Sequence, residues 1–136
     1  MMNAMIRETR HLSVYIDRPV TEVYDYISNP ANLAEWAAGL GRSLEKIDGQ
    51  WVMDSPSGPT VIVFTPPNEF GVVDHHVTTA EGETVYVPMR VIADGDSSEL
   101  VFSLRRLPGM TDDEFDRDSS AVSTDLALAK KILERE

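Results

Sequence analysis

Residues 16–36, IDRPVTEVYDYISNPANLAEW, contain two prolines that each stand at the start of a helical pattern. Pro19 suits the first turn of a helix, because its missing N–H needs no partner there. Apolar residues then repeat at helical spacing over residues 20–27. Asn29 fits an N-cap and Pro30 fits the first position of a following helix. The stretch therefore predicts two short helices that meet at this pair.

Strand patterns surround this helical stretch. HLSVYID alternates apolar and polar residues before it, as a half-buried strand does. After it the apolar period becomes two, and Asp48-Gly49 predicts a tight hairpin turn. The six strands expected after the helices cover residues 43–47, 50–54, 60–64, 70–79, 84–93 and 99–107.

The last segment, from Thr111 to Glu136, predicts one long amphipathic helix. Thr111-x-x-Glu114 is a capping box, and acidic residues fill the first turn while basic residues fill the last. One apolar stripe runs along the segment through Phe115, Val122, Leu126, Ala129 and Leu133. The order of elements indicates an α+β domain, an antiparallel sheet with its helices on one face.

Length and composition narrow the class of protein. A chain of 136 residues is expected to form a single domain, residues 1–136. Its net charge of −11 argues against nucleic acid as a partner and against an anionic membrane surface. Without cysteine, disulfides and cysteine zinc sites are excluded. The first ten residues lack a long apolar run, so we expect a cytoplasmic protein without membrane insertion.

The phrase RPVTEVYDYISNPANLAEW, followed by an antiparallel meander and a C-terminal helix, resembles the START-like or Bet v 1-like superfamily. Within it, the chain is most similar to bacterial polyketide cyclase/dehydrase-like (SRPBCC) ligand-binding proteins. The resemblance begins at about His11 and runs to the end of the chain. It implies the helix-grip fold: a curved seven-stranded antiparallel sheet wrapped around the long C-terminal helix, with the two short helices closing one end.

The resemblance also implies an internal cavity between the sheet and the C-terminal helix. The expected function is binding of a small hydrophobic molecule, lipid-like or aromatic and polyketide-like. The alternative is an enzyme of the polyketide cyclase, aromatase or dehydrase type. The apolar concave face with few polar groups favours binding, and a homodimer stays open.

Hairpin registers indicate which side chains face the concave side of the sheet, because a slip of one residue reverses every side chain. A three-residue loop at residues 81–83 places His75 opposite Met89, and the next hairpin places Met89 opposite Phe102. With aromatic and methionine residues elsewhere, the candidate ligand-binding set is Trp36, Met53, Phe64, His75, Val77, Val87, Met89, Phe102, Leu104, Arg106, Met110 and Phe115.

His75 is the one ionisable group near the middle of this apolar face. It could contact a ligand or act as a general acid or base. A buried imidazole bonded to a neighbouring backbone group fits the same pattern. His76 points the other way, and the histidines lack metal-ligand spacing. Phosphate-binding and nucleophile motifs are absent from the sequence as well, so we expect neither a metal nor a cofactor.

Other candidates have two interpretations each. Arg106 could meet an acidic ligand at the cavity rim, or it could be a solvated residue at a strand end. Trp36 could cap the cavity or fill the core. On the opposite face of the sheet, Asp74 and Arg90 are predicted to form an exposed ion pair worth less than about 1 kcal/mol.

Overall fold

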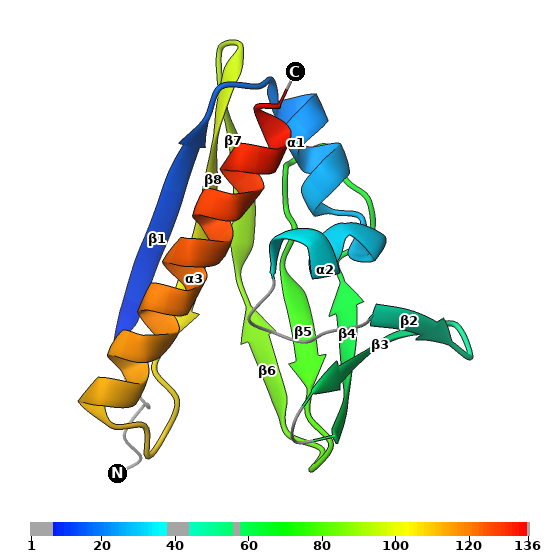
Figure 1. Ribbon diagram of the computed structural model, residues 1–136, viewed down its shortest axis with the longest axis vertical. Coiled ribbons are helices and arrows are strands. Elements are labelled where there is room, and N and C mark those ends of the chain that lie inside the picture. The colour runs from blue at the N-terminus through cyan, green and yellow to red at the C-terminus, as the bar shows by residue number, and fades with distance from the viewer. Residues whose placement is uncertain (1–6, 38–43, 56–57, 136) are drawn as a thin grey trace, which may run out of the picture.

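A computed structural model describes residues 7–37, 44–55 and 58–135 (Figure 1). The elements follow the predicted order of one strand, short helices, a run of strands and a long helix. They are β1 (Thr9–Ile16), α1 (Val20–Ile27), the 3-10 helix η1 (Pro30–Asn32), α2 (Leu33–Trp36), β2 (Leu44–Ile47), β3 (Gln50–Ser55), β4 (Gly58–Phe64), β5 (His75–Thr78), β6 (Thr84–Val87), β7 (Met89–Asp94), β8 (Ser97–Arg105) and α3 (Asp112–Leu133).

The predicted junction between the two short helices is confirmed. The side-chain oxygen of Asn29 accepts a hydrogen bond from the backbone N–H of Ala31, with 3.0 Å between the heavy atoms. Pro30 then starts η1, which continues directly into α2. Both α-helices bury one face, made of Val23, Ile27, Leu33 and Trp36.

The strands form two sheets, and the prediction of a single seven-stranded sheet was wrong. Among the described residues there are eight strands, in a three-stranded sheet of order β1-β8-β7 and a five-stranded sheet of order β2-β3-β4-β5-β6. Pro88 interrupts the long strand predicted for residues 84–93, because proline has no N–H to donate to a ladder. As a result β6 pairs with β5, whereas β7 pairs with β8.

The segment from Gly71 to Val73 joins the two sheets. The N–H of Val91 donates to the carbonyl of Gly71, and the N–H of Val73 donates to the carbonyl of Met89, each at 2.9 Å. Gly71 has a φ of 72°, and a Cβ there would collide with the carbonyl oxygen of Val91. Only glycine permits this close backbone approach. The two backbone hydrogen bonds then hold the sheets together through this short irregular segment.

One predicted strand register is confirmed and another was wrong by two residues. Met89 lies opposite Phe102, as expected. His75, however, lies opposite Val87 rather than Met89, because the connection occupies residues 79–83 and not only the three residues assumed. A shift of two positions leaves each side chain on the same face of the sheet. The error therefore moved contacts along the strand without turning the apolar face outward.

Helix α3 begins with the predicted capping box. The Thr111 hydroxyl oxygen accepts from the N–H of Glu114 at 3.1 Å, and the Glu114 carboxylate accepts from the N–H of Thr111 at 2.9 Å. Near the other end, the Glu134 carboxylate accepts from the N–H of Asp17 at 2.8 Å. Figure 1 shows α3 running along β1 with its C-terminal end beside α1. The helix is thus tied to the corner between β1 and α1.

Candidate functional site

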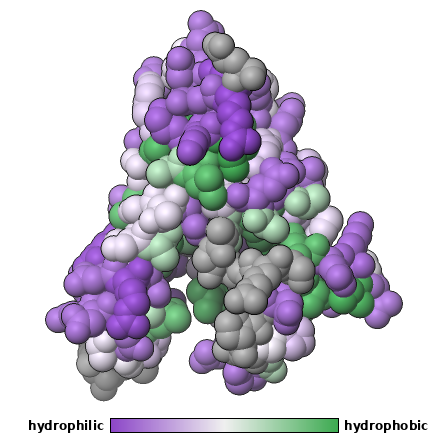
Figure 2. All heavy atoms as spheres, viewed as in Figure 1, coloured by the Kyte–Doolittle hydropathy of each residue, from purple (hydrophilic) through white to green (hydrophobic). Residues whose placement is uncertain are grey.

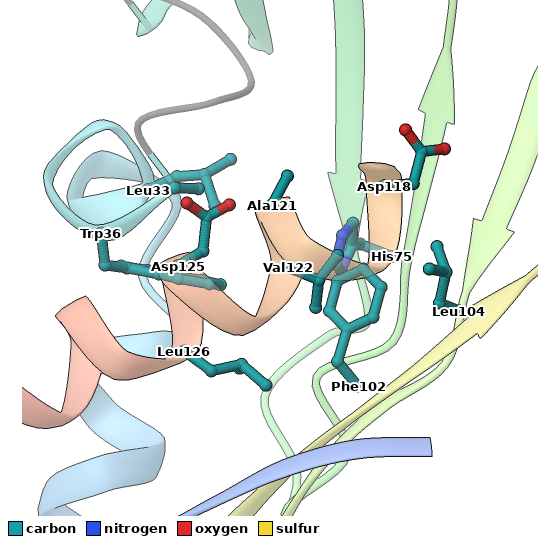
Figure 3. A pocket seen from close by; sticks show the side chains of 11 residues that line it. Leu33, Trp36, His75, Phe102, Leu104, Asp118, Ala121, Val122, Asp125 and Leu126 are labelled. Carbon is teal, nitrogen blue, oxygen red and sulfur yellow. The ribbon is translucent and has the colours of Figure 1, made fainter. Parts of the chain in front are cut away.

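A cavity of about 250 Å³ lies between α2, α3 and the strands β5 and β8 (Figure 3). Apolar side chains make up most of its described lining, and one imidazole is the exception among the strand residues. The lining residues are Leu33, Trp36, Ala37, His75, Phe102, Leu104, Asp118, Ala121, Val122, Asp125 and Leu126.

Helix α3 forms one wall because its lining residues recur three or four positions apart, which places them on one helix face. They are Asp118, Ala121, Val122, Asp125 and Leu126. The predicted apolar stripe already included two of these residues, but the sequence analysis did not assign any of them to the cavity. The spacing identifies the buried face of the helix, but it does not show which turns of that face border a cavity.

The structure brings four predicted residues together: Trp36, His75, Phe102 and Leu104. Phe102 and Leu104 are two positions apart on β8, so both point to the same face of the strand. Trp36 comes from α2 and His75 begins β5. These four belong to three elements, and tertiary packing alone makes them neighbours.

His75 is buried, bonded to the backbone and part of the cavity lining. It is 4% exposed, its Nδ1 lies 3.2 Å from the carbonyl oxygen of Val73, and it lines the cavity. One ring face stacks on Phe64, with 4.9 Å between ring centroids. Burial lowers the pKa of His75, although the Val73 carbonyl and the charge of Asp74 oppose that shift. The imidazole is therefore neutral at pH 7.

Trp36 contributes to the core and to the cavity wall. Its side chain belongs to the buried core, and its ring lines the cavity. Among the described residues, its Nε1 is the one buried side-chain nitrogen or oxygen without a hydrogen-bond partner. The indole therefore forms a mainly apolar wall, with its polar atom held away from water.

Four other predicted residues face the interior but do not line this cavity. Met53 and Met89 are buried in the core, and Phe64 and Val77 are partly buried against it. Helix α1 contacts β7, so the space next to Met89 is filled by side chains. The hairpin registers placed Val77 and Met89 on the inner face of the sheet but could not show where the packing leaves a void.

Arg106, Met110 and Phe115 lie together away from the cavity, near the start of α3. The Arg106 guanidinium donates to the carbonyl of Met110 at 3.1 and 2.9 Å and forms an ion pair with Asp112 at 2.6 Å. The Phe115 ring has the guanidinium of Arg10 at 4.2 Å and that of Arg106 at 5.7 Å from its centroid. These contacts assign the three residues to the attachment of α3.

Val87 borders a second, smaller cavity of about 140 Å³, where β6 separates from β8. Phe102, Leu104 and Asp118 line both cavities. Figure 2 shows the same face hollowed between the lower part of α3 and the ends of strands β4 to β6. The split of the sheet at Pro88 therefore leaves open space next to the larger cavity.

Asp74 lies on the other side of the sheet and corrects one prediction. It pairs with Arg90 as expected, through two contacts of 2.9 Å, but its side chain is only 3% exposed. The N–H of Met89 at 2.7 Å and the hydroxyl of Tyr86 also donate to it. Burial alone would raise the pKa of Asp74, but the bonds from Arg90, Tyr86 and Met89 lower it to about 2. The prediction of an exposed pair was wrong for Asp74, whereas the Arg90 side chain is 49% exposed.

In the described part of the chain, no group of three or more His, Cys, Asp or Glu residues could hold a metal ion. No helix within residues 7–37, 44–55 and 58–135 has the length and apolar character needed to cross a membrane.

Comparison with known proteins places the chain by its fold. No protein-family model matches the sequence, and no curated protein sequence is significantly similar to it. Solved structures do match. DynU16, a protein of the dynemicin biosynthetic locus, aligns with a TM-score of 0.69 and 16% identity, over 93% of this chain and 47% of that one.

Two further structures align over nearly their whole length. The Bet v 1-type allergen Ara h 8.0201 has a TM-score of 0.64 and 11% identity, covering 93% of this chain and 97% of its own. Truncated norcoclaurine synthase from Thalictrum flavum has a TM-score of 0.62 and 14% identity, covering 99% and 100%.

The chain shares the fold of these structures, antiparallel strands packed with a long C-terminal helix. In this fold the long helix α3 and the strands enclose the cavity, and α2 closes one side of it. The present chain spans about half of DynU16, 47% of its length. At these identities the likeness concerns the fold alone.

Proposed function

We propose that this protein binds a small hydrophobic molecule in the cavity between α2, α3 and β8. The observation that carries the proposal is the cavity itself, about 250 Å³ with a mostly apolar lining and one buried imidazole. Ligand sites in proteins are typically concave, apolar and equipped with a few polar groups. This cavity has each of those properties.

The volume limits the size of the ligand. A cavity of roughly 150 Å³ holds benzene, and sites for drug-sized molecules start at about 300 Å³. The present cavity, about 250 Å³, lies between these values. A compound with one or two rings fits this space, whereas a polycyclic product would require the walls to move.

The structural neighbours support a small-molecule role. One is named as a synthase, and another belongs to a biosynthetic locus. The alternative from the sequence, an enzyme of the polyketide cyclase type with His75 as acid or base, has less support. His75 is held by a backbone carbonyl, which fixes the ring but does not activate it as a carboxylate would. Binding without turnover is the simpler proposal.

Replacing Val122 by tryptophan is expected to fill the cavity and abolish binding. Val122 is partly buried and lines the cavity. We expect naphthalene, tested by native mass spectrometry and thermal shift, to bind roughly tenfold or more weakly, because its space is taken. The melting temperature should stay unchanged or rise, since the new side chain enters empty space.

Leu128→Trp is the matched control, because Leu128 is also partly buried on α3 but does not line the cavity. There the larger side chain should leave naphthalene binding intact, because the cavity keeps its volume. Unchanged binding in Val122→Trp, or no binding of any apolar probe by the unmodified protein, would contradict the proposed function.

A further inference from the structure

The His75 ring is fixed on two sides. Its Nδ1 lies 3.2 Å from the carbonyl oxygen of Val73, and one ring face stacks on Phe64 with an interplanar angle of 24°. A carbonyl oxygen can only accept a hydrogen bond. Nδ1 must therefore carry the proton, which is the donor in this contact.

The protonation state of Nε2, the second ring nitrogen of His75, follows from that of Nδ1. In a neutral imidazole one nitrogen is a donor and the other an acceptor, so Nε2 carries a lone pair and no proton. None of the hydrogen bonds of the described residues involves Nε2. Nε2 is also not fully buried without a hydrogen-bond partner. In the described chain, Trp36 Nε1 is the one side-chain nitrogen or oxygen in that situation. Nε2 therefore reaches the cavity that His75 lines.

The groups around His75 act on its pKa in opposite directions, and burial is the largest effect. Burial lowers its pKa, His76 on the same strand acts in the same direction, and Asp74 opposes them. From the facing helix, Asp118 and Asp125 line the same cavity. The Asp118 carboxylate is an acceptor, as Nε2 is, and the unpaired donor among the described lining residues, Trp36 Nε1–H, is buried. Nε2 is therefore the acceptor that the strand side of the lining presents to a ligand.

We propose that the ligand is an uncharged ring compound carrying a hydroxyl or N–H group, which donates a hydrogen bond to Nε2 of His75. This rests on the proposed function and adds the chemistry by which the cavity selects its ligand. An apolar wall alone favours a methyl group over a hydroxyl group, because the hydroxyl loses its bonds to water on entry. A fixed acceptor in that wall compensates for the loss and reverses the preference.

The test compares 2-naphthol with 2-methylnaphthalene, which have the same ring system and differ in the donor. Dissociation constants are measured for the unmodified protein, for His75→Leu and for His76→Leu. His76 is the matched control, since it adjoins His75 but is exposed and contacts Tyr86 on the other face. We expect the unmodified protein to bind 2-naphthol more tightly.

In His75→Leu the ratio of the two dissociation constants should change in favour of 2-methylnaphthalene by on the order of tenfold, and in His76→Leu it should not change. If both probes bind but the ratio is the same in all three proteins, the role of His75 is overturned while the proposed function stands. If neither probe binds the unmodified protein, the proposed function fails with it.

A second measurement needs no variant and covers the case in which His75→Leu does not fold. Long-range ¹H–¹⁵N correlation spectra report the protonation of each imidazole nitrogen. Nε2 of His75 should have the shift of an unprotonated nitrogen in the free protein, and this shift should move with 2-naphthol but not with 2-methylnaphthalene. A protonated Nε2 in the free protein, or the same response to both probes, would overturn the proposal.

Discussion

Asp74→Ala is expected to lower the free energy of unfolding by about 2–3 kcal/mol, the scale of lost hydrogen bonds to a charged group. The carboxylate accepts from Arg90, from Tyr86 and from the N–H of Met89. Without it, the Met89 N–H loses its acceptor in the buried interior, whereas Arg90 and Tyr86 are partly exposed and can turn to water. Urea unfolding at pH 7 measures the loss.

The position of Asp74 explains why the effect should be large. It precedes β5 of one sheet and bonds to Met89 and Arg90, which begin β7 of the other. Asp94→Ala is the matched control, because Asp94 also accepts from a tyrosine, Tyr15, but is exposed. We expect that substitution to cost under about 1 kcal/mol. Equal costs for the two variants would contradict the structural role of Asp74.

The same carboxylate should make the protein sensitive to acid. The pKa of Asp74 falls from 3.8 to about 2 on folding, which corresponds to about 2 kcal/mol of stability at neutral pH. Because the folded-state value is the lower one, this stability is present above pH 3.8 and is lost as the pH falls toward 2, with about half lost at pH 3.

Unfolding free energies from pH 7 to pH 3 check this for the unmodified protein and Asp74→Asn. The remaining carboxylates titrate in both proteins, so the difference between the two curves isolates Asp74. We expect that difference to shrink by about 1 kcal/mol between pH 5 and pH 3. A constant difference would show that Asp74 does not titrate as its contacts indicate.

Phe115→Ala is expected to cost about 3–5 kcal/mol, as truncation of a fully buried phenylalanine does. Phe115 is 0% exposed, and its ring contacts the guanidinium groups of Arg10 on β1 and Arg106 after β8. The substitution removes the buried ring that both guanidinium groups contact at the first turn of α3. Urea unfolding gives the size of the loss.

Phe70→Ala provides the comparison for Phe115, because Phe70 is 82% exposed. Its truncation should change stability by under about 0.5 kcal/mol. Ligand binding offers a second control, since neither phenylalanine lines the cavity. If Phe115→Ala were as stable as Phe70→Ala, the attachment of α3 through this ring would be refuted.

Local signals in the sequence were sufficient for the order of the elements. Asn29-Pro30 separated the two short helices, and Thr111 with Glu114 marked the start of α3. Asp48-Gly49 placed the hairpin between β2 and β3, with both residues at positive φ. Each signal works because the residues that produce the structure are adjacent or within one helical turn. Alternation also placed His75, Phe102 and Leu104 on the inner face of the sheet.

Only the tertiary structure decided where that inner face is filled and where it is empty. Period-two alternation is the same along the whole strand, so it could not separate Met89, which is fully packed, from Phe102, which borders a cavity. It also could not show that Asp74, on the outer face, is covered by Tyr86 and Arg90. The burial of a position depends on which side chains from distant parts of the chain pack against it. Those contacts are set by the placement of α3 and by the break in the sheet at Pro88.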